Sequence, residues 1–138
     1  MTLDEKIQKI SDHWFEQAQE DLETAEAIFR QAKRNAAALF FLHLASEKLL
    51  KSKVVQITKT HAPFTHNLVV LAEKTGWEID SHILAILSDV SEFNLSGRYP
   101  QEKDQFKLKA THEFTEHSFQ RVKELWDWIS LKSGLKPS

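Results

Sequence analysis

The chain has 138 residues, enough for one domain with its own hydrophobic core. Hydrophobic residues make up 41% of the sequence and charged residues 28%, which excludes a wholly disordered chain. The formal net charge is −2, so a basic field over the whole surface is excluded and any site for an anion has to be a local cluster. Cysteine is absent, which excludes disulfides, thiol catalysis and zinc–thiolate sites.

The N-terminal segment MTLDEKIQK is polar and acidic, unlike a signal peptide. No apolar run approaches the length of a membrane span. We therefore expect a cytoplasmic protein with no membrane segment. We expect a single domain over residues 1–138, with a disordered tail at about 134–138.

Apolar residues recur at helical spacing along most of the chain, and the three glycines and three prolines fall between these segments. This pattern predicts an all-α bundle. The expected helices cover residues 7–32, 35–57, 66–75, 80–95 and 106–132, approximately. Thr65 is the expected cap of the third helix, Gly76 its stop, and Asp80 or Ser81 the cap of the fourth. Residues 94–106 are expected to form a loop, in which Pro100 keeps the preceding residue out of helical geometry.

The stretch FFLHLASEKLLK, residues 40–51, is apolar on both sides of the expected second helix. One side also carries three polar groups, His43, Glu47 and Lys51. A helix that is apolar nearly all round is central in its bundle or pressed against a second subunit. The polar groups are therefore expected in or beside a poorly hydrated place.

Glu47 and Lys51 are four residues apart, which favours an intrahelical ion pair worth about 0.2–0.5 kcal/mol. In a site without water the energy of that pair does not offset the cost of burying the two ions, because desolvating each ion costs several kcal/mol. Arg98 is the expected additional partner, since a guanidinium grips a carboxylate with two hydrogen bonds. His43, Glu47 and Arg98 then form a structural polar cluster that locks the 94–106 loop onto the second helix. The competing interpretation is that Arg98 binds a ligand directly.

Four segments, taken in order, resemble the HEPN domain (higher eukaryote and prokaryote nucleotide-binding). They are Trp14 with Asp21-Leu22 and Ala25, then HLASEKLLK at 43–51, THNL at 65–68 and GRYP at 97–100. The resemblance implies an up-and-down bundle of four to five helices that commonly forms a homodimer. It also implies work alongside a minimal nucleotidyltransferase, often encoded next door, in toxin–antitoxin-like or accessory modules.

Many HEPN proteins are metal-independent ribonucleases, marked by an arginine, four to six further residues and then a histidine. The seven residues after Arg98 are YPQEKDQ, without a histidine, and Arg34 lies nine positions before His43. Arg30 and Arg121 are also not followed by a histidine at the required spacing. The sequence therefore favours a non-catalytic binding module that binds a nucleotide or serves a nucleotidyltransferase. The alternative is a ribonuclease toxin with a non-standard site, assembled in space from His43, His66 and Arg98.

Basic and aromatic residues of these segments form the expected binding pocket, for a nucleotide phosphate or for the acidic surface of a partner. The predicted ligand-binding residues are Lys48, Lys51, His66, Arg98 and Tyr99. His66 has a competing structural role, a hydrogen bond at the start of the third helix. The sequence has no glycine-rich phosphate loop, and we expect no cofactor other than a bound nucleotide.

Other polar and aromatic patterns are assigned to the surface. His112 and His117 are five positions apart, about 140° around a helix, so no metal site is expected. The runs at Lys33-Arg34 and at Lys51-Ser-Lys53 are expected to be solvated. Trp128 fits the core stripe of the last helix, which leaves Trp126 as a candidate exposed aromatic.

Overall fold

The computed structural model describes residues 1–134, so all but the first residue of the predicted disordered tail lies outside the described residues. Every regular element in this part of the chain is a helix, which confirms the all-α prediction. The elements are α1 (Leu3–Ala27), the π-helix η1 (Ile28–Ala32), α2 (Asn35–Thr58), α3 (Leu68–Lys74), α4 (Ser81–Ser91), α5 (Pro100–Lys109) and α6 (His112–Lys132).

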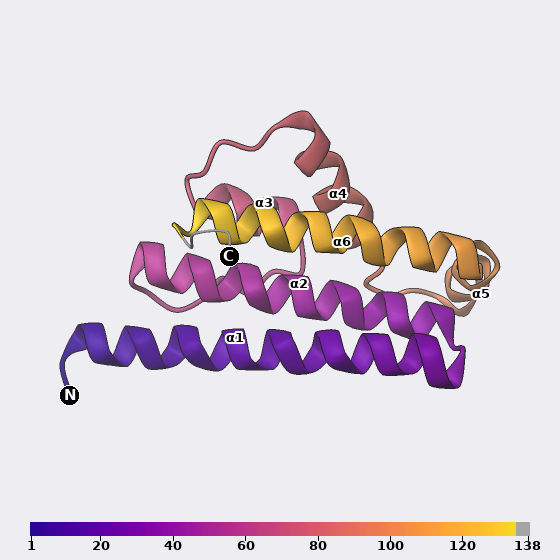
Figure 1. The fold of residues 1–138 in the computed structure, drawn as a ribbon, viewed down its shortest axis with the longest axis horizontal. Helices are drawn as coiled ribbons and strands as arrows, with labels where there is room; N and C mark the ends of the chain where they lie inside the picture. The colour runs from indigo at the N-terminus through magenta and orange to yellow at the C-terminus, as the bar shows by residue number, and fades with distance from the viewer. Residues whose placement is uncertain (135–138) are drawn as a thin grey trace.

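The α2 helix is the centre of the bundle, as predicted. Figure 1 shows α1 and α2 as two long antiparallel rods, with α6 along the opposite side of α2 and with α3 and α4 covering a further side. Each of the other helices packs against α2. Fourteen of the 24 residues of α2 are buried, so little of the surface of this helix is exposed to solvent.

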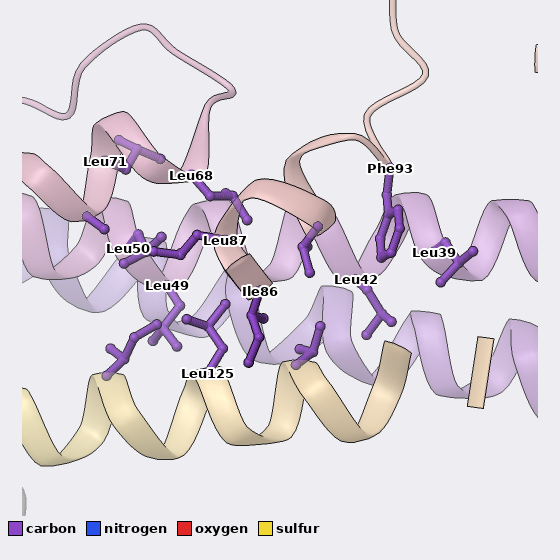
Figure 2. Packing of buried hydrophobic residues seen from close by; sticks show 14 of the residues in the cluster. Leu39, Leu42, Leu49, Leu50, Leu68, Leu71, Ile86, Leu87, Phe93 and Leu125 are labelled. Carbon is purple, nitrogen blue, oxygen red and sulfur yellow. The ribbon is translucent and has the colours of Figure 1, made fainter. Parts of the chain in front are cut away.

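The main core lies between α2, α4 and α6. Leu42 and Leu49 of α2 converge on Ile86 of α4 and on Leu125 of α6 (Figure 2). Trp126 packs against this core, and its Nε1 donates to Ser46 Oγ at 3.3 Å. The expectation of an exposed Trp126 is therefore wrong, because α6 lies close enough to α2 for a large side chain beside the core stripe to reach it.

Small residues form the seam between α1 and α2. They recur every seven positions on both helices, at Ser11, Ala18 and Ala25 and at Ala38, Ala45 and Ser52, and each is at most 1% exposed. Ser11 Oγ donates to the Ser52 carbonyl at 3.1 Å, and Ser52 Oγ donates to the Ser11 carbonyl at 2.8 Å. In an antiparallel pair this register places Ala18 opposite Ala45, and small side chains there let the backbones approach closely.

The segment after α4 differs from expectation. Residues 100–109, predicted to be mostly loop, form α5, and the last helix begins at His112 instead of about Phe106. Pro100 occupies the first turn of α5, where its missing N–H costs nothing and its fixed φ suits a helix. Tyr99 before it is extended, as predicted. Thr111 then starts α6 by accepting a hydrogen bond from the Phe114 N–H.

The helix ends near α3 follow local capping chemistry. Asn67, rather than the predicted Thr65, caps α3 by accepting from the Val69 and Val70 N–H groups. Thr65 Oγ1 instead accepts from the Asn67 N–H at 3.1 Å and fixes the capping residue. Gly76 follows α3 with φ +77°, and Asp80 caps α4, both as predicted.

The seam predicts a specific sensitivity to side-chain size. We expect Ala45→Leu to lower the free energy of unfolding by about 1–3 kcal/mol, because three extra carbons have no space between two closely packed backbones. Urea unfolding followed by circular dichroism measures this. Ala27→Leu, at an exposed position of α1, is the matched control and should leave the stability within about 0.5 kcal/mol. Equal stabilities for the two variants would show that the helices are not closely packed at Ala45.

Candidate functional site

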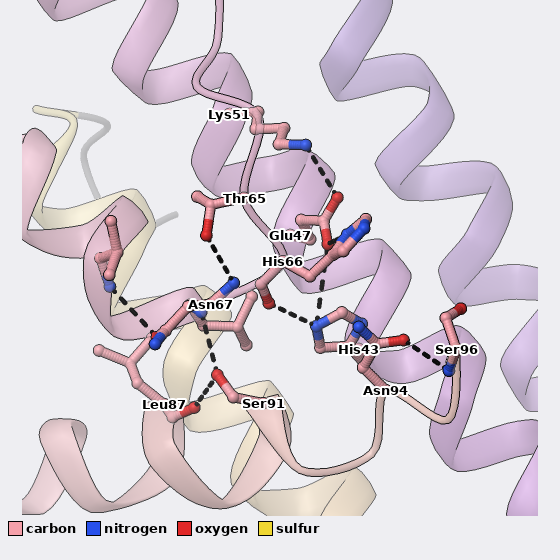
Figure 3. A network of polar contacts seen from close by, with 12 residues as sticks. His43, Glu47, Lys51, Thr65, His66, Asn67, Leu87, Ser91, Asn94 and Ser96 are labelled. Carbon is pink, nitrogen blue, oxygen red and sulfur yellow. Dashed lines mark hydrogen bonds and ion pairs between the residues drawn. The ribbon is translucent and has the colours of Figure 1, made fainter. Parts of the chain in front are cut away.

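A buried carboxylate, Glu47, is the centre of a polar cluster between α2 and the loop that precedes α3. Its side chain is 5% exposed. Lys51 Nζ donates to Glu47 Oε2 at 2.9 Å, and His66 Nδ1 lies 2.8 Å from Glu47 Oε1 (Figure 3). His43 Nε2 lies 3.8 Å from the same Oε1. Both carboxylate oxygens are therefore occupied by nitrogen donors.

The helical spacing of α2 and the cap of α3 assemble this cluster. His43, Glu47 and Lys51 are four residues apart and line one side of α2. His66 arrives from the loop, one residue before the Asn67 cap. The start of α3 is held in turn by Ser91 of α4, whose Oγ accepts from the Leu68 N–H at 3.0 Å.

His43 is fully buried and ties α2 to the loop. Its Nε2 lies 2.9 Å from the His66 carbonyl oxygen, which only accepts, so Nε2 carries the proton and donates. Burial lowers the pKa of His43 below its ordinary value, and the hydrogen bond to His66 and the charge of Glu47 oppose that shift only in part. Among the described residues, Nδ1 has no hydrogen-bond partner. His43 is therefore a neutral structural group near pH 7.

His66 is the open member of the cluster, because its side chain is 64% exposed. With Nδ1 donating to Glu47, the neutral ring has its lone pair on Nε2. Within residues 1–134, Nε2 makes no hydrogen bond. A buried carboxylate that orients an exposed imidazole leaves one ring nitrogen able to accept a proton, and once protonated that nitrogen can donate to a phosphate oxygen.

The predicted pairing of Arg98 with Glu47 is wrong. Arg98 Nη2 donates to the carbonyl oxygen of Glu92 at 2.9 Å. Gly97, at φ +76°, turns the chain back toward the end of α4, where Glu92 is the C-cap and its carbonyl needs a donor. Tyr99 is 75% exposed and does not pin the loop to α2.

The five predicted ligand-binding residues therefore lie in three places. Lys51 and His66 meet at Glu47. Lys48 faces α1, where its Nζ lies 2.7 Å from Asp21 Oδ2, an ion pair rather than an aligned hydrogen bond. Arg98 and Tyr99 are at the end of α4 and the start of α5.

The lysines predicted to be solvated on α2 are buried. Lys51 is 7% exposed, and its Nζ lies 5.2 Å from the ring centroid of Trp14. Lys53 is 8% exposed, with Nζ 5.5 Å from the ring centroid of Phe15, and burial lowers its pKa. Both stems run between α1 and α2, and the aromatic faces of α1 stabilise the two charges.

The HEPN domain family matches residues 11–133 of the chain. This chain belongs to the HEPN domain family. HEPN domains are nucleotide-binding or ribonuclease-type modules that often dimerise, so the resemblance seen in the sequence is confirmed at the level of the family. Comparison with curated proteins and with solved structures gives no match. In the part of this HEPN chain that the structure describes, no helix is both long and apolar enough to cross a membrane.

His43 predicts a dependence of stability on pH. Its pKa in the folded protein lies below the ordinary 6.5, so the unfolded chain binds this proton more readily. The corresponding stability is fully present above about pH 6.5 and is lost as the pH falls toward the folded pKa. In urea unfolding between pH 7.5 and 5 we expect the free energy of unfolding to fall as the pH drops below 6.5, by at most about 1.4 kcal/mol per pH unit from this group. As the pH is lowered, the free energy of unfolding of His43→Gln should fall less than that of wild type. The free energy of unfolding of His61→Gln, a change at an exposed histidine, should fall as that of wild type does. Parallel curves for wild type and His43→Gln would contradict the assignment.

The partners of Glu47 predict which cation stabilises the fold. We expect Lys51→Met to lower the free energy of unfolding by about 3 kcal/mol, because it removes one partner of a buried ion pair. Arg98→Ala should cost no more than about 1 kcal/mol, because it loses one hydrogen bond to a backbone carbonyl. Thermal and urea unfolding of both variants decide this. A larger loss for Arg98→Ala than for Lys51→Met would restore the arginine as the partner of Glu47.

Proposed function

We propose that this HEPN domain is a non-catalytic binding module. It binds a nucleotide, acts as an accessory subunit of a minimal nucleotidyltransferase in a toxin–antitoxin-like or regulatory pair, or does both. The observation that carries the proposal is the arrangement around Glu47. One cation, Lys51, and one exposed imidazole, His66, lie on the same carboxylate at 2.9 and 2.8 Å. Lys51 is buried against this carboxylate, and His66 presents the exposed nitrogen beside the central helix.

The separation of the arginine from the histidines supports binding over catalysis. Cleavage of RNA without metal needs a cation and a general acid or base that converge on one phosphate. Arg98 is engaged with the Glu92 carbonyl, and His43 is fully buried and neutral. His66 thus lacks the arginine partner expected of a ribonuclease site.

The surface beside the cluster supports self-association. Phe40 and Leu44 are only partly buried and lie one turn apart on α2. An apolar pair of this kind on a central helix suits the contact between two copies of a helical bundle. We therefore propose a homodimer with α2 near its interface.

One observation favours the ribonuclease alternative. The buried Glu47 orients the exposed ring of His66 through a contact of 2.8 Å, as in a carboxylate–histidine pair that acts on a proton. A second copy of the chain would then have to supply the cation. This alternative predicts RNA cleavage in the presence of a metal chelator.

The experiment is a titration of the purified protein with ATP, GTP and a short single-stranded RNA, followed by calorimetry and by gel analysis of the RNA in EDTA. We expect a nucleotide to bind without RNA cleavage, and His66→Ala to weaken that binding about tenfold or more, since it removes a hydrogen bond to a charged group. His61→Ala, an exposed histidine of the same loop, is the matched control and should bind as wild type does.

The other outcomes separate the alternatives. RNA cleavage that is lost in His66→Ala and kept in His61→Ala would establish the ribonuclease. No binding of any of the three ligands, together with failure of a minimal nucleotidyltransferase to co-purify or to change its activity, would remove both functions.

A further inference from the structure

Basic side chains collect at the end of the bundle where η1, α2 and α5 meet. Figure 1 shows α5, the start of α6 and the turn between η1 and α2 together at this end. Two surface hollows of about 530 and 540 Å³ share Lys33 and Asn35 in their walls. Arg30 lines the first hollow, and Arg34 and Lys107 line the second. We call the two hollows together the basic hollow, and its four cations are Arg30, Lys33, Arg34 and Lys107.

Three of the four charges of the basic hollow face no acidic wall, whereas Arg30 also lines a third hollow that contains Glu26, Glu116 and Asp127. The walls of both hollows contain no acidic residue. Among the ion pairs of residues 1–134, none involves any of the four cations, whereas Lys48 and Lys51 each have a carboxylate partner. Four cations without an ion-pair partner thus line two hollows that share Lys33, in a chain of net charge −2. Like charges held together repel one another, and an anion bound between them relieves that repulsion.

The backbone adds donors to the same place. Lys33 adopts φ 54°, a left-handed conformation that ends η1 and carries the chain into α2. No side chain caps α2, and Ala36 and Ala37 of its first turn line the second hollow. The free N–H groups of that turn therefore add partial positive charge to the four side chains.

Part of the walls is fixed before any ligand arrives. Asn35 Nδ2 donates to the Ala110 carbonyl at 3.0 Å and joins the start of α2 to the end of α5. His112 stacks on Phe29 with ring centroids 5.0 Å apart, while its side chain remains 73% exposed and its Nε2 lies 3.4 Å from Glu116. These fixed parts add no ordering cost to binding, whereas the exposed lysine and arginine side chains are ordered when the anion binds.

We propose that the basic hollow is a second binding site, specific for a di- or triphosphate group. Two arginines and two lysines match the three to four negative charges of such a group, and guanidinium forks suit its adjacent oxygens. The hollows have the size of small-molecule sites. The basic hollow is distinct from the Glu47 cluster, because Glu47 lies 12 residues further along α2 than Asn35, roughly 18 Å at the helical rise.

The test uses inorganic tripolyphosphate, ATP and AMP as probes of the full-length protein, by calorimetry at 50 mM and at 200 mM salt. The double variant Lys33→Gly and Lys107→Gln removes two charges, and glycine tolerates the left-handed conformation at position 33. We expect tripolyphosphate to bind at least about tenfold more weakly to this variant. We expect ATP to lose one of its two sites, and AMP, which has no di- or triphosphate group, to bind equally to both proteins. The expected affinities fall as salt rises.

The matched control is the double variant Lys9→Gln and Lys103→Gln. It makes the same change in net charge at two exposed lysines outside the hollows. We expect its affinity for tripolyphosphate to stay within about twofold of wild type. Circular dichroism and melting curves of both variants establish that each is folded.

Each remaining outcome has one meaning. If tripolyphosphate binds to wild type more tightly than ATP does, the ligand of the site is a free polyphosphate. If ATP binds more tightly, the ligand is a nucleotide. Failure of both to bind, equal weakening in the two double variants, or binding of single-stranded RNA alone would overturn the second site. Loss of ATP binding in His66→Ala with no change in Lys33→Gly, Lys107→Gln would overturn it while leaving the proposed function intact.

Discussion

The burial of one carboxylate constrains much of this fold. Removing a charged group from water costs several kcal/mol unless its partners are well placed, and Glu47 is 4% exposed in the middle of the central helix. Lys51 satisfies one oxygen from the same helix, and His66 satisfies the other from the loop before α3. The second partner has to come from outside α2, so its position fixes the course of the 59–67 loop and, through the Asn67 cap, the start of α3.

The sequence predicts the parts of the site that depend on helical periodicity. His43, Glu47 and Lys51 fall on one side of α2 by spacing alone, and the Glu47–Lys51 pair follows from that spacing. The burial of α2 also follows, because its apolar residues leave no polar face. The same pattern cannot show that the stems of Lys51 and Lys53 lie over Trp14 and Phe15, since that depends on the register of α1 against α2.

The partner of Glu47 depends on tertiary turns, and there sequence reasoning selected the wrong cation. A guanidinium has the right chemistry, but the turn at Gly97 directs Arg98 to a carbonyl at the end of α4. The sequence indicates His66 as a ligand-binding residue or as a hydrogen-bonding group at the start of α3, and not as the partner of Glu47. The residues of α5 are mostly polar and give no apolar periodicity, although Pro100 in its first turn is a common start for a helix. The lack of acidic neighbours around Lys33 and Arg34 is likewise visible only when α5 and η1 are brought together.

The small-residue seam has a mechanical consequence. Ser11 and Ser52 bond reciprocally, and alanines continue the contact toward the other end of both helices. The α1 and α2 helices therefore form one rigid unit, because tilting either helix would break the close contacts between their backbones. The turn that contains Lys33 and Arg34 lies at one end of this helix pair, and Glu47 lies further along α2. The basic hollow and Glu47 therefore lie on the same rigid pair of helices, which fixes the distance between them.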